Sequence, residues 1–142
     1  MPIYYMNEGS FELPGVAITD HTTHVVETKH PDHDVTLVVC RSPFPTGKSV
    51  RQLARGRVLD EMTRLVGYAV LEEREALWAE VPAVELTSRW RHEGRVFYQQ
   101  QAHLGLETTW LYFALSAPLE HQAPCDAWFE QIRSSLQLRS DA

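Results

Sequence analysis

The sequence predicts an α+β domain, in which a curved and mainly antiparallel β-sheet carries two amphipathic helices packed on one face. Three observations support this class. Runs of β-branched and aromatic residues alternate with turn formers, two segments change to a helical spacing of apolar residues, and the later connections are as short as hairpin turns. With 142 residues, 44% of them hydrophobic, the chain fits one domain over residues 1–142.

Four short strands are expected before the first helix, at residues 3–6, 10–13, 22–28 and 35–41. Asn7, Glu8 and Gly9 form a turn between the first two, and Pro14 would end the second of them. We assign this opening pattern a structural role rather than a binding role. Pro31 and its neighbouring aspartates separate the other two strands, which is a hairpin pattern.

The apolar spacing then changes to three and four, which predicts an amphipathic helix with Ser49 as N-cap, Met62 in its apolar stripe and Gly67 as its stop. Further strands are expected at residues 68–78, 83–92, 96–104 and 108–117. Glu93 and Gly94 can form the two-residue turn between the second and third of these. An apolar stripe within residues 123–138 predicts the closing helix.

Two of the expected strands are apolar on both faces. In residues 35–41, Val39 points one way while Val38 and Cys40 point the other, because side chains alternate along a strand. The strand at 108–117 shows the same pattern. Two helices on one face would leave the other face free of helices, and an exposed apolar face usually marks an interaction surface.

The turn at Glu93 and Gly94 also sets a register between the flanking strands. Ser88 should pair with Gln99, and Leu86 with Gln101. A buried amide without partners costs about 1 to 3 kcal/mol. We therefore expect these glutamines either to face water or to meet polar groups of a bound ligand.

Charge and composition narrow the range of partners. A formal net charge of −6 argues against nucleic acid and anionic membranes. The first residues lack the pattern of a signal peptide and no segment approaches the ~18 apolar residues of a membrane span, so a cytoplasmic protein is expected. Cys40 and Cys125 lack the spacing of a zinc site and are expected to be reduced thiols.

No catalytic signature is found, so we expect neither an enzyme nor a cofactor. The Gly47-Lys48 pair opens a helix as a phosphate-binding loop would, but Ser42 stands where that loop requires glycine. Pro43 and Pro45 also lack the backbone N–H groups that cradle phosphate. A group of histidines and aspartates has the chemistry of a zinc or nickel site, although it is also ordinary turn chemistry, and we expect no metal there. Its members are His21, His24, His30, Asp32, His33 and Asp34.

Several motifs, taken in order, resemble the Eag family of type VI secretion effector chaperones, within the larger DcrB-like group. They are YMNEGSFELP followed by Asp20, the TLVVCR strand, the amphipathic helix, and the Arg-Trp pair, Gly turn and Gln-x-Gln strand of SRWRHEGRVFYQQQAHL. Two positions differ from the usual family pattern. LPGVAI stands where members often have LPEG and an aromatic residue, and Cys40 stands where a small hydroxyl residue is typical.

The resemblance implies a cytoplasmic homodimer that binds the apolar N-terminal helices of a secreted effector and shields them from water before loading on the secretion spike. It implies no direct association with the membrane. Helix-free faces of the two protomers would form a shared concave surface. The implied helix-binding residues are Thr23, Val25, Thr36, Val38, Cys40, Gln99 and Gln101. Polar groups among apolar ones would imitate the packing of helices in lipid.

The alternative is a small-molecule binding protein or an enzyme with a pocket on the curved sheet. Four aromatic residues would line that pocket: Trp90, Tyr98, Trp110 and Tyr112.

Overall fold

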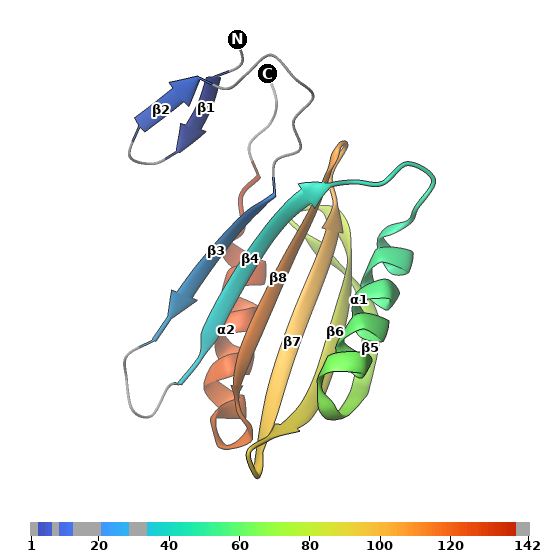
Figure 1. Ribbon diagram of the computed structural model, residues 1–142, viewed down its shortest axis with the longest axis vertical. Coiled ribbons are helices and arrows are strands. Elements are labelled where there is room, and N and C mark those ends of the chain that lie inside the picture. The colour runs from blue at the N-terminus through green and yellow to red at the C-terminus, as the bar shows by residue number, and fades with distance from the viewer. Residues whose placement is uncertain (1–2, 7–8, 13–20, 29–33, 139–142) are drawn as a thin grey trace.

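The computed structural model describes residues 3–6, 9–12, 21–28 and 34–138. Strands β1 (Ile3–Met6) and β2 (Gly9–Glu12) pair only with each other. The main sheet has six antiparallel strands in the spatial order β3-β4-β8-β7-β6-β5 (Figure 1). These strands are β3 (Thr22–Glu27), β4 (Thr36–Pro43), β5 (Val66–Trp78), β6 (Val81–His92), β7 (Arg95–Gly105) and β8 (Thr109–Pro118). Helix α1 (Val50–Arg64) precedes β5, while a short 3₁₀ turn η1 (Leu119–His121) and helix α2 (Gln122–Ser135) follow β8.

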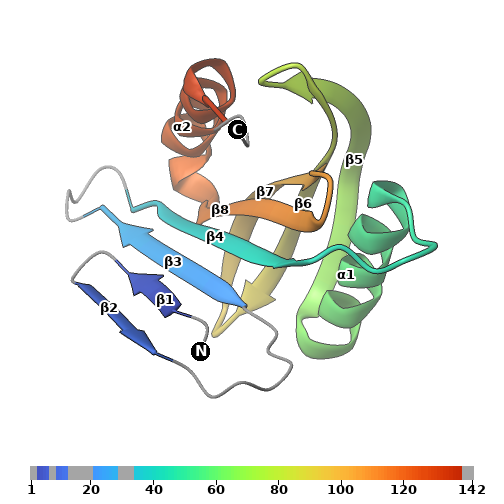
Figure 2. The same cartoon turned by 90° about the horizontal axis from the view of Figure 1, so that it is seen from above.

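The two helices lie on opposite faces of the curved sheet (Figure 2). Ala83 of β6 belongs to the apolar cluster that contains Phe129 of α2. The next residue, Val84, packs with Ala54 of α1. Because neighbouring residues of a strand point to opposite faces, α1 and α2 cover different sides. The α+β class with a mainly antiparallel sheet and two helices is confirmed, but the expectation that both helices lie on one face is wrong.

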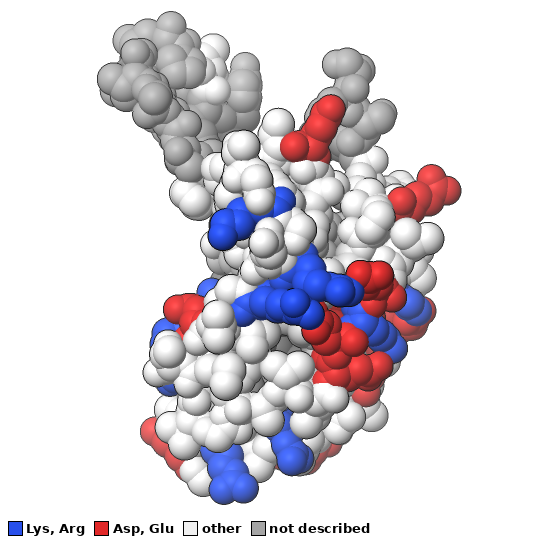
Figure 3. Space-filling model, turned by 90° about the vertical axis from the view of Figure 1, so that its right-hand side faces the viewer, with Lys and Arg blue, Asp and Glu red and all other residues white. Residues whose placement is uncertain are grey.

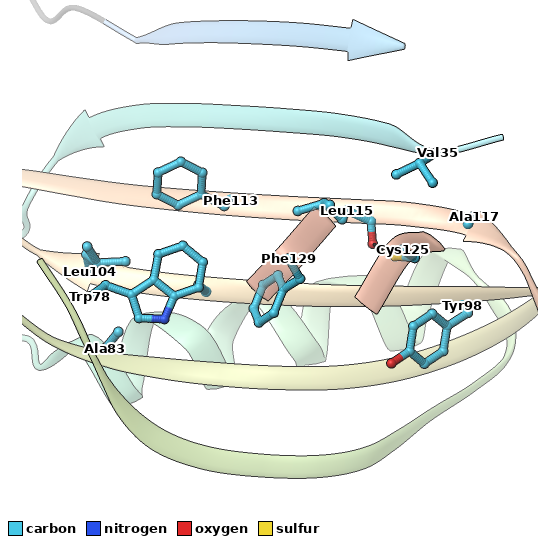
Figure 4. Packing of buried hydrophobic residues seen from close by; sticks show 11 residues of the cluster. Val35, Trp78, Ala83, Tyr98, Leu104, Phe113, Leu115, Ala117, Cys125 and Phe129 are labelled. Atoms are coloured by element: carbon cyan, nitrogen blue, oxygen red, sulfur yellow. Dashed lines mark hydrogen bonds between the residues drawn. The ribbon is translucent and has the colours of Figure 1, made fainter. Parts of the chain in front are cut away.

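Strands that are apolar on both sides require cover on both sides, and this explains the arrangement. The α2 face is closed by the larger core cluster, in which Trp78 stacks on Phe113 with ring centroids 5.3 Å apart and meets the edge of Phe129 at 5.1 Å (Figure 4). The indole nitrogen of Trp78 donates to Glu85 Oε2 at 2.8 Å, so the polar atom of this fully buried ring is satisfied.

Helix α1 begins at its predicted cap. Ser49 Oγ accepts the Gln52 backbone N–H at 3.1 Å, and the Ser49 N–H donates to Gln52 Oε1 at 2.8 Å, which completes a capping box. The helix ends at Arg64, and the expected stop, Gly67, lies instead inside β5 with a φ of +64°. Met62, expected in the buried stripe, is exposed, whereas Glu61 is buried.

The β6–β7 hairpin follows the sequence-based prediction. Glu93 and Gly94 both have positive φ, at 50° and 77°, as a two-residue hairpin turn of type I′ requires. The register pairs Ser88 with Gln99 and Leu86 with Gln101, as expected. The earlier turn lies at Ala79 and Glu80, both with positive φ, so β6 begins at Val81 instead of residue 83.

Candidate functional site

All seven helix-binding positions expected from the sequence share one sheet face, which is the face that carries α1. Strand pairing places them in rows that run across β3, β4, β8 and β7. The rows are Thr23, Cys40, Tyr112 and His103; Val25, Val38, Ala114 and Gln101; and Glu27, Thr36, Ser116 and Gln99. The seven residues therefore lie on one face, as the alternation along each strand requires.

Helix α1 covers only part of this face, since it packs mainly against β5, β6 and β7. We call the part formed by β3, β4 and β8 the open face; its residues are Thr23, Val25, Glu27, Thr36, Val38, Cys40, Tyr112, Ala114 and Ser116. Val25 is 59% exposed, and Val38 and Cys40 are half-buried. The face expected to be free of helices is thus half covered. On its other half the accessible part of the middle row is apolar and lies on β3 and β4, at Val25 and Val38, while Ala114 and Tyr112 of β8 are buried.

Gln101 lies at the border between α1 and the open face, where it is 1% exposed. Its side-chain nitrogen donates to Glu61 Oε1 of α1 at 2.9 Å and to Gln99 Oε1 at 2.6 Å. Gln99 in turn donates to Ser116 Oγ at 3.0 Å. Both glutamines are buried, and their amides are hydrogen-bonded to each other and to neighbouring side chains of the same layer. They therefore neither face water nor lack partners that a ligand would have to supply.

His103 continues this network toward two aromatic rings. The Trp110 indole N–H donates to His103 Nδ1 at 3.1 Å, which leaves the proton on Nε2 to donate to Gln101 Oε1 at 2.9 Å. The His103 ring also stacks on Tyr112, with centroids 5.1 Å apart and planes 10° from parallel. Burial, with a smaller effect from the Arg57 charge, lowers the pKa of His103 to about 3, so the ring is neutral at pH 7.

Glu61 connects the network to α1. Its carboxylate is almost fully buried, and Oε1 lies 3.3 Å from Arg57 Nε, one helical turn earlier. Arg57 also lies over the Tyr112 ring, 5.4 Å from its centroid. Within residues 34–138, Glu61 Oε2 has no hydrogen-bond partner. A charged pair and an amide, rather than a continuous apolar seam, therefore hold this part of the helix to the sheet.

The site also contains four residues that were not predicted from the sequence as helix-binding positions: His103, Tyr112, Ser116 and Glu61. His103 could have been included, since it follows Gln99 and Gln101 in the same alternation on β7. Ser116 requires the register between β7 and β8, and Glu61 requires the placement of α1. Neither relationship has a local signal in the sequence.

The aromatic residues of the alternative pocket do not come together. Trp110 and Tyr112 belong to the α1 face, and Trp90 stacks on Phe97 near the far end of that face. Tyr98 lies on the α2 face, where its hydroxyl donates to Asp126 at 2.6 Å beside a separate pocket of about 470 Å³. The sheet thus offers no single pocket lined by all four rings.

In the described ranges, no group of three or more His, Cys, Asp or Glu side chains is placed to hold a metal ion. Residues 30–33 of the expected hairpin lie outside those ranges. Asn7, Glu8 and Pro14 of the expected opening turn lie outside them as well. No helix among the described residues is long and apolar enough to cross a membrane. Cys40 and Cys125 are free thiols, as expected.

Several solved structures have a similar fold although their sequences differ strongly from this chain. A protein of unknown function from Pseudomonas aeruginosa, PA94, is 16% identical with a TM-score of 0.76, and 99% of each chain is covered. LpqN, involved in cell envelope biogenesis of Mycobacterium tuberculosis, is 11% identical with a TM-score of 0.62 over 85% of each chain. CyanoP, the PsbP of Synechocystis sp. PCC 6803, is 15% identical with a TM-score of 0.59, over 91% of this chain and 98% of its own.

No curated protein sequence matches this chain. The model of the DcrB family matches residues 8–135, which include β2, the whole six-stranded sheet and both helices. A match over so much of the chain establishes the family, and the protein belongs to the DcrB family.

Proposed function

We propose that the protein is a chaperone that binds and shields an apolar transmembrane helix of a type VI secretion effector before the effector is loaded on the secretion spike. The observation that carries the proposal is the open face, whose middle row is apolar, with Val25 exposed, Val38 half-buried and Ala114 buried. This row lies between two rows that carry hydroxyl and thiol groups and, at Glu27, a carboxylate. The resemblance of the sequence motifs to the Eag family, a narrower group than DcrB, supports the choice of client.

The dimensions of the open face suit one helix. Three neighbouring strands span two interstrand spacings, about 10 Å, which is close to the ~10 Å diameter of a helix. Strand β4 has 8 residues, and at ~3.3 Å per residue it extends about 26 Å. The open-face residues of β4, from Thr36 to Cys40, span about 13 Å of this length. A membrane-spanning helix crosses about 30 Å of hydrocarbon, so the open face would cover the central part of such a helix.

The mixture of side chains suits a helix that normally packs in lipid. Burial of apolar surface on the middle row contributes roughly 25 cal/mol per Å². The flanking rows offer Thr23, Thr36 and Ser116, whose hydroxyls can bond to small polar residues of the helix at ~0.6 kcal/mol or more each. The Gln101 side chain already donates hydrogen bonds to Glu61 of α1 and to Gln99. Its role in the proposed function is therefore to hold these neighbouring polar side chains in place, and it does not contact the effector helix.

The proposal includes a cytoplasmic homodimer without a cofactor. One open face can cover only one side of a bound helix, and the other side would stay in water. A second protomer that presents its own open face would cover it, and two such faces form the shared concave surface expected from the sequence. No catalytic step is required for this function.

A solubility experiment tests the proposal. A synthetic apolar helix of about 20 residues, with serine and glycine on one side, is diluted from detergent with or without the protein, and the soluble fraction is measured after ultracentrifugation. The wild-type protein should keep the peptide soluble. Val38→Asp should abolish this effect, because a carboxylate is not desolvated against hydrocarbon without a partner. His24→Asp introduces the same group on the opposite face of β3 and should behave as wild type. Equal capture by Val38→Asp would contradict the proposal.

A further inference from the structure

Two arginines on β6 differ from the other arginines of the structure in their pairing. Arg89 and Arg91 form no ion pair with any residue in the described ranges. Ion pairs with carboxylates are formed by Arg51, Arg55, Arg57, Arg64, Arg74, Arg95 and Arg133. On the side of the molecule that carries α1 and β5, basic and acidic atoms are accordingly interleaved (Figure 3).

Arg89 and Arg91 border the same pocket. They are two residues apart on β6, so their side chains leave the same face of the strand about 7 Å apart, on the side opposite to the open face. The pocket has a volume of about 220 Å³. Its other lining residues are Gly67, Ala69, Trp90, Val96 and Leu119. The site therefore combines two cations with walls that are largely apolar.

Arg91 lies beside a glycine of the edge strand. Gly67 has a φ of +64°, in the left-handed region that favours glycine, and a Cβ built there would lie 3.6 Å from Arg91 Cγ and 3.7 Å from Cδ. The aliphatic stem of Arg91 thus lies against the start of β5.

The described acidic residues near this end of the sheet form no ion pair with Arg89 or Arg91. Glu120 accepts from Arg95 at 2.8 Å, and Glu93 lies 3.8 Å from the His92 ring nitrogen. In a chain with a formal net charge of −6, two guanidiniums at one pocket without a carboxylate are a local excess of positive charge.

We propose that this pocket binds an acidic peptide segment of another protein, with a carboxylate on Arg89 and Arg91 and a neighbouring apolar side chain between Val96 and Leu119. The planar guanidinium matches a carboxylate in two parallel hydrogen bonds. Strand β5 is an edge of the sheet, so its free backbone groups beside the pocket can pair with an extended peptide. A nucleic acid is a poorer match, since its affinity depends on many phosphate contacts. The site lies on the opposite face from the open face and does not depend on helix binding there.

Fluorescence anisotropy with defined peptides tests the site. The probe is an end-blocked peptide with one aspartate between two leucines, and its matched control has asparagine in place of aspartate. The full-length protein should bind the acidic peptide at least tenfold more tightly than the control. The double variant Arg89→Gln/Arg91→Gln should lose at least tenfold in affinity, whereas Arg51→Gln/Arg55→Gln, with the same change in net charge, should bind as wild type. Leu119→Ser should weaken binding several-fold, because the leucine of the peptide loses its apolar contact.

Three results would overturn the proposal. The first is equal binding of the aspartate and asparagine peptides. The second is undiminished binding by Arg89→Gln/Arg91→Gln, provided that its thermal unfolding matches that of the wild type. The third is displacement of the peptide by inorganic phosphate at concentrations equal to those of unlabelled peptide, which would indicate a general anion site. Capture of an apolar helix by the open face should be unchanged in the same double variant, so the two sites are tested separately.

Discussion

Gln101 of β7 and Glu61 of α1 meet at 2.9 Å in the layer between helix and sheet, and both side chains are almost completely buried. The carboxylate also pairs with Arg57, and the amide oxygen of Gln101 accepts from His103. Removal of one member would leave several buried polar groups without partners. The attachment of α1 therefore depends on polar chemistry at its C-terminal half and on Ala54, Val50 and Val58 at its N-terminal half.

Glu61→Ala should lower the free energy of unfolding by about 2 to 3 kcal/mol, because the Gln101 amide and Arg57 lose a buried acceptor. The measurement is urea denaturation. Asp60→Ala is the matched control, since its exposed carboxylate also pairs with Arg57 and its loss should change stability by less than about 0.5 kcal/mol. Equal effects of the two variants would mean that Glu61 does not hold the helix.

The two glutamines should respond differently to replacement by leucine. Gln101→Leu removes the acceptor of His103 and a donor to Glu61, so a loss of about 2 kcal/mol in unfolding free energy is expected. Gln99→Leu removes a donor to Ser116 and one acceptor of the Gln101 amide, which keeps its bond to Glu61, and should cost about 1 kcal/mol.

Gln99→Leu should also change the selectivity for a bound helix. Ser116 would lose its partner on β7, so the polar row would be altered while the apolar row remained. The test is a competition between a serine- and glycine-containing helix and a scrambled helix of equal hydrophobicity. An unchanged preference would show that this row does not contribute to selection.

Neighbouring valines of β4 offer a matched pair for the two faces of the sheet. Val39 packs against the core beneath α2, whereas Val38 lies on the open face. Val39→Asp should unfold the protein or lower its melting temperature by many degrees, because it buries a charge. Val38→Asp should leave the melting temperature within a few degrees of wild type. If Val38→Asp were equally damaging, the open face would be part of the core.

His103 predicts a specific dependence of stability on pH. Its pKa is about 3 in the folded state and about 6.5 when unfolded, so the unfolded state takes up a proton first as the pH falls. The stabilisation is complete above about pH 6.5 and is lost as the pH falls from there toward 3, at up to about 1.4 kcal/mol per pH unit.

The comparison with His103→Gln isolates this effect from the titration of carboxylates. Between pH 6.5 and pH 5, the wild type should lose about 2 kcal/mol more unfolding free energy than the variant. Urea denaturation at both pH values measures the difference. Parallel pH profiles would show that His103 is not held neutral by its surroundings.

The sequence predicts the parts of this fold that depend on neighbouring residues. Strand alternation and the Glu93-Gly94 turn are local, and they place the expected binding residues of each strand on one side of that strand. That all seven share one face of the sheet depends on the pairing of β8 with β4 and β7. The Ser49 cap is local as well. The opposite placement of the two helices is different, because it depends on how the chain passes from β4 to β5 around the edge of the sheet.

Dependence on residues distant in the sequence also explains why Glu61 and the two arginines of β6 were not predicted to have special roles. Nothing in the helix spacing of α1 distinguishes the buried Glu61 from the exposed Asp60 beside it. The contact between Glu61 and Gln101 joins residues 40 positions apart and exists only once the helix lies on β7. Similarly, the Arg-Trp-Arg stretch at 89–91 has the sequence pattern of a strand before a turn. That its two arginines lie at one pocket without an ion pair depends on the positions of all the charged side chains in the folded structure.

The two cysteines give the molecule a natural reporter and its internal control. Cys40 lies half-buried in the open face beside Thr23. Cys125 is fully buried on the side of α2 that packs on the sheet, where burial raises the pKa of its thiol to about 12. An alkylating reagent should therefore modify the first thiol in the folded protein and reach the second only after unfolding. A bound helix should protect Cys40 from the reagent, so the extent of its modification measures binding at the open face without any engineered label. An unmodified Cys125 in the same mass spectrum would show that the protein had stayed folded.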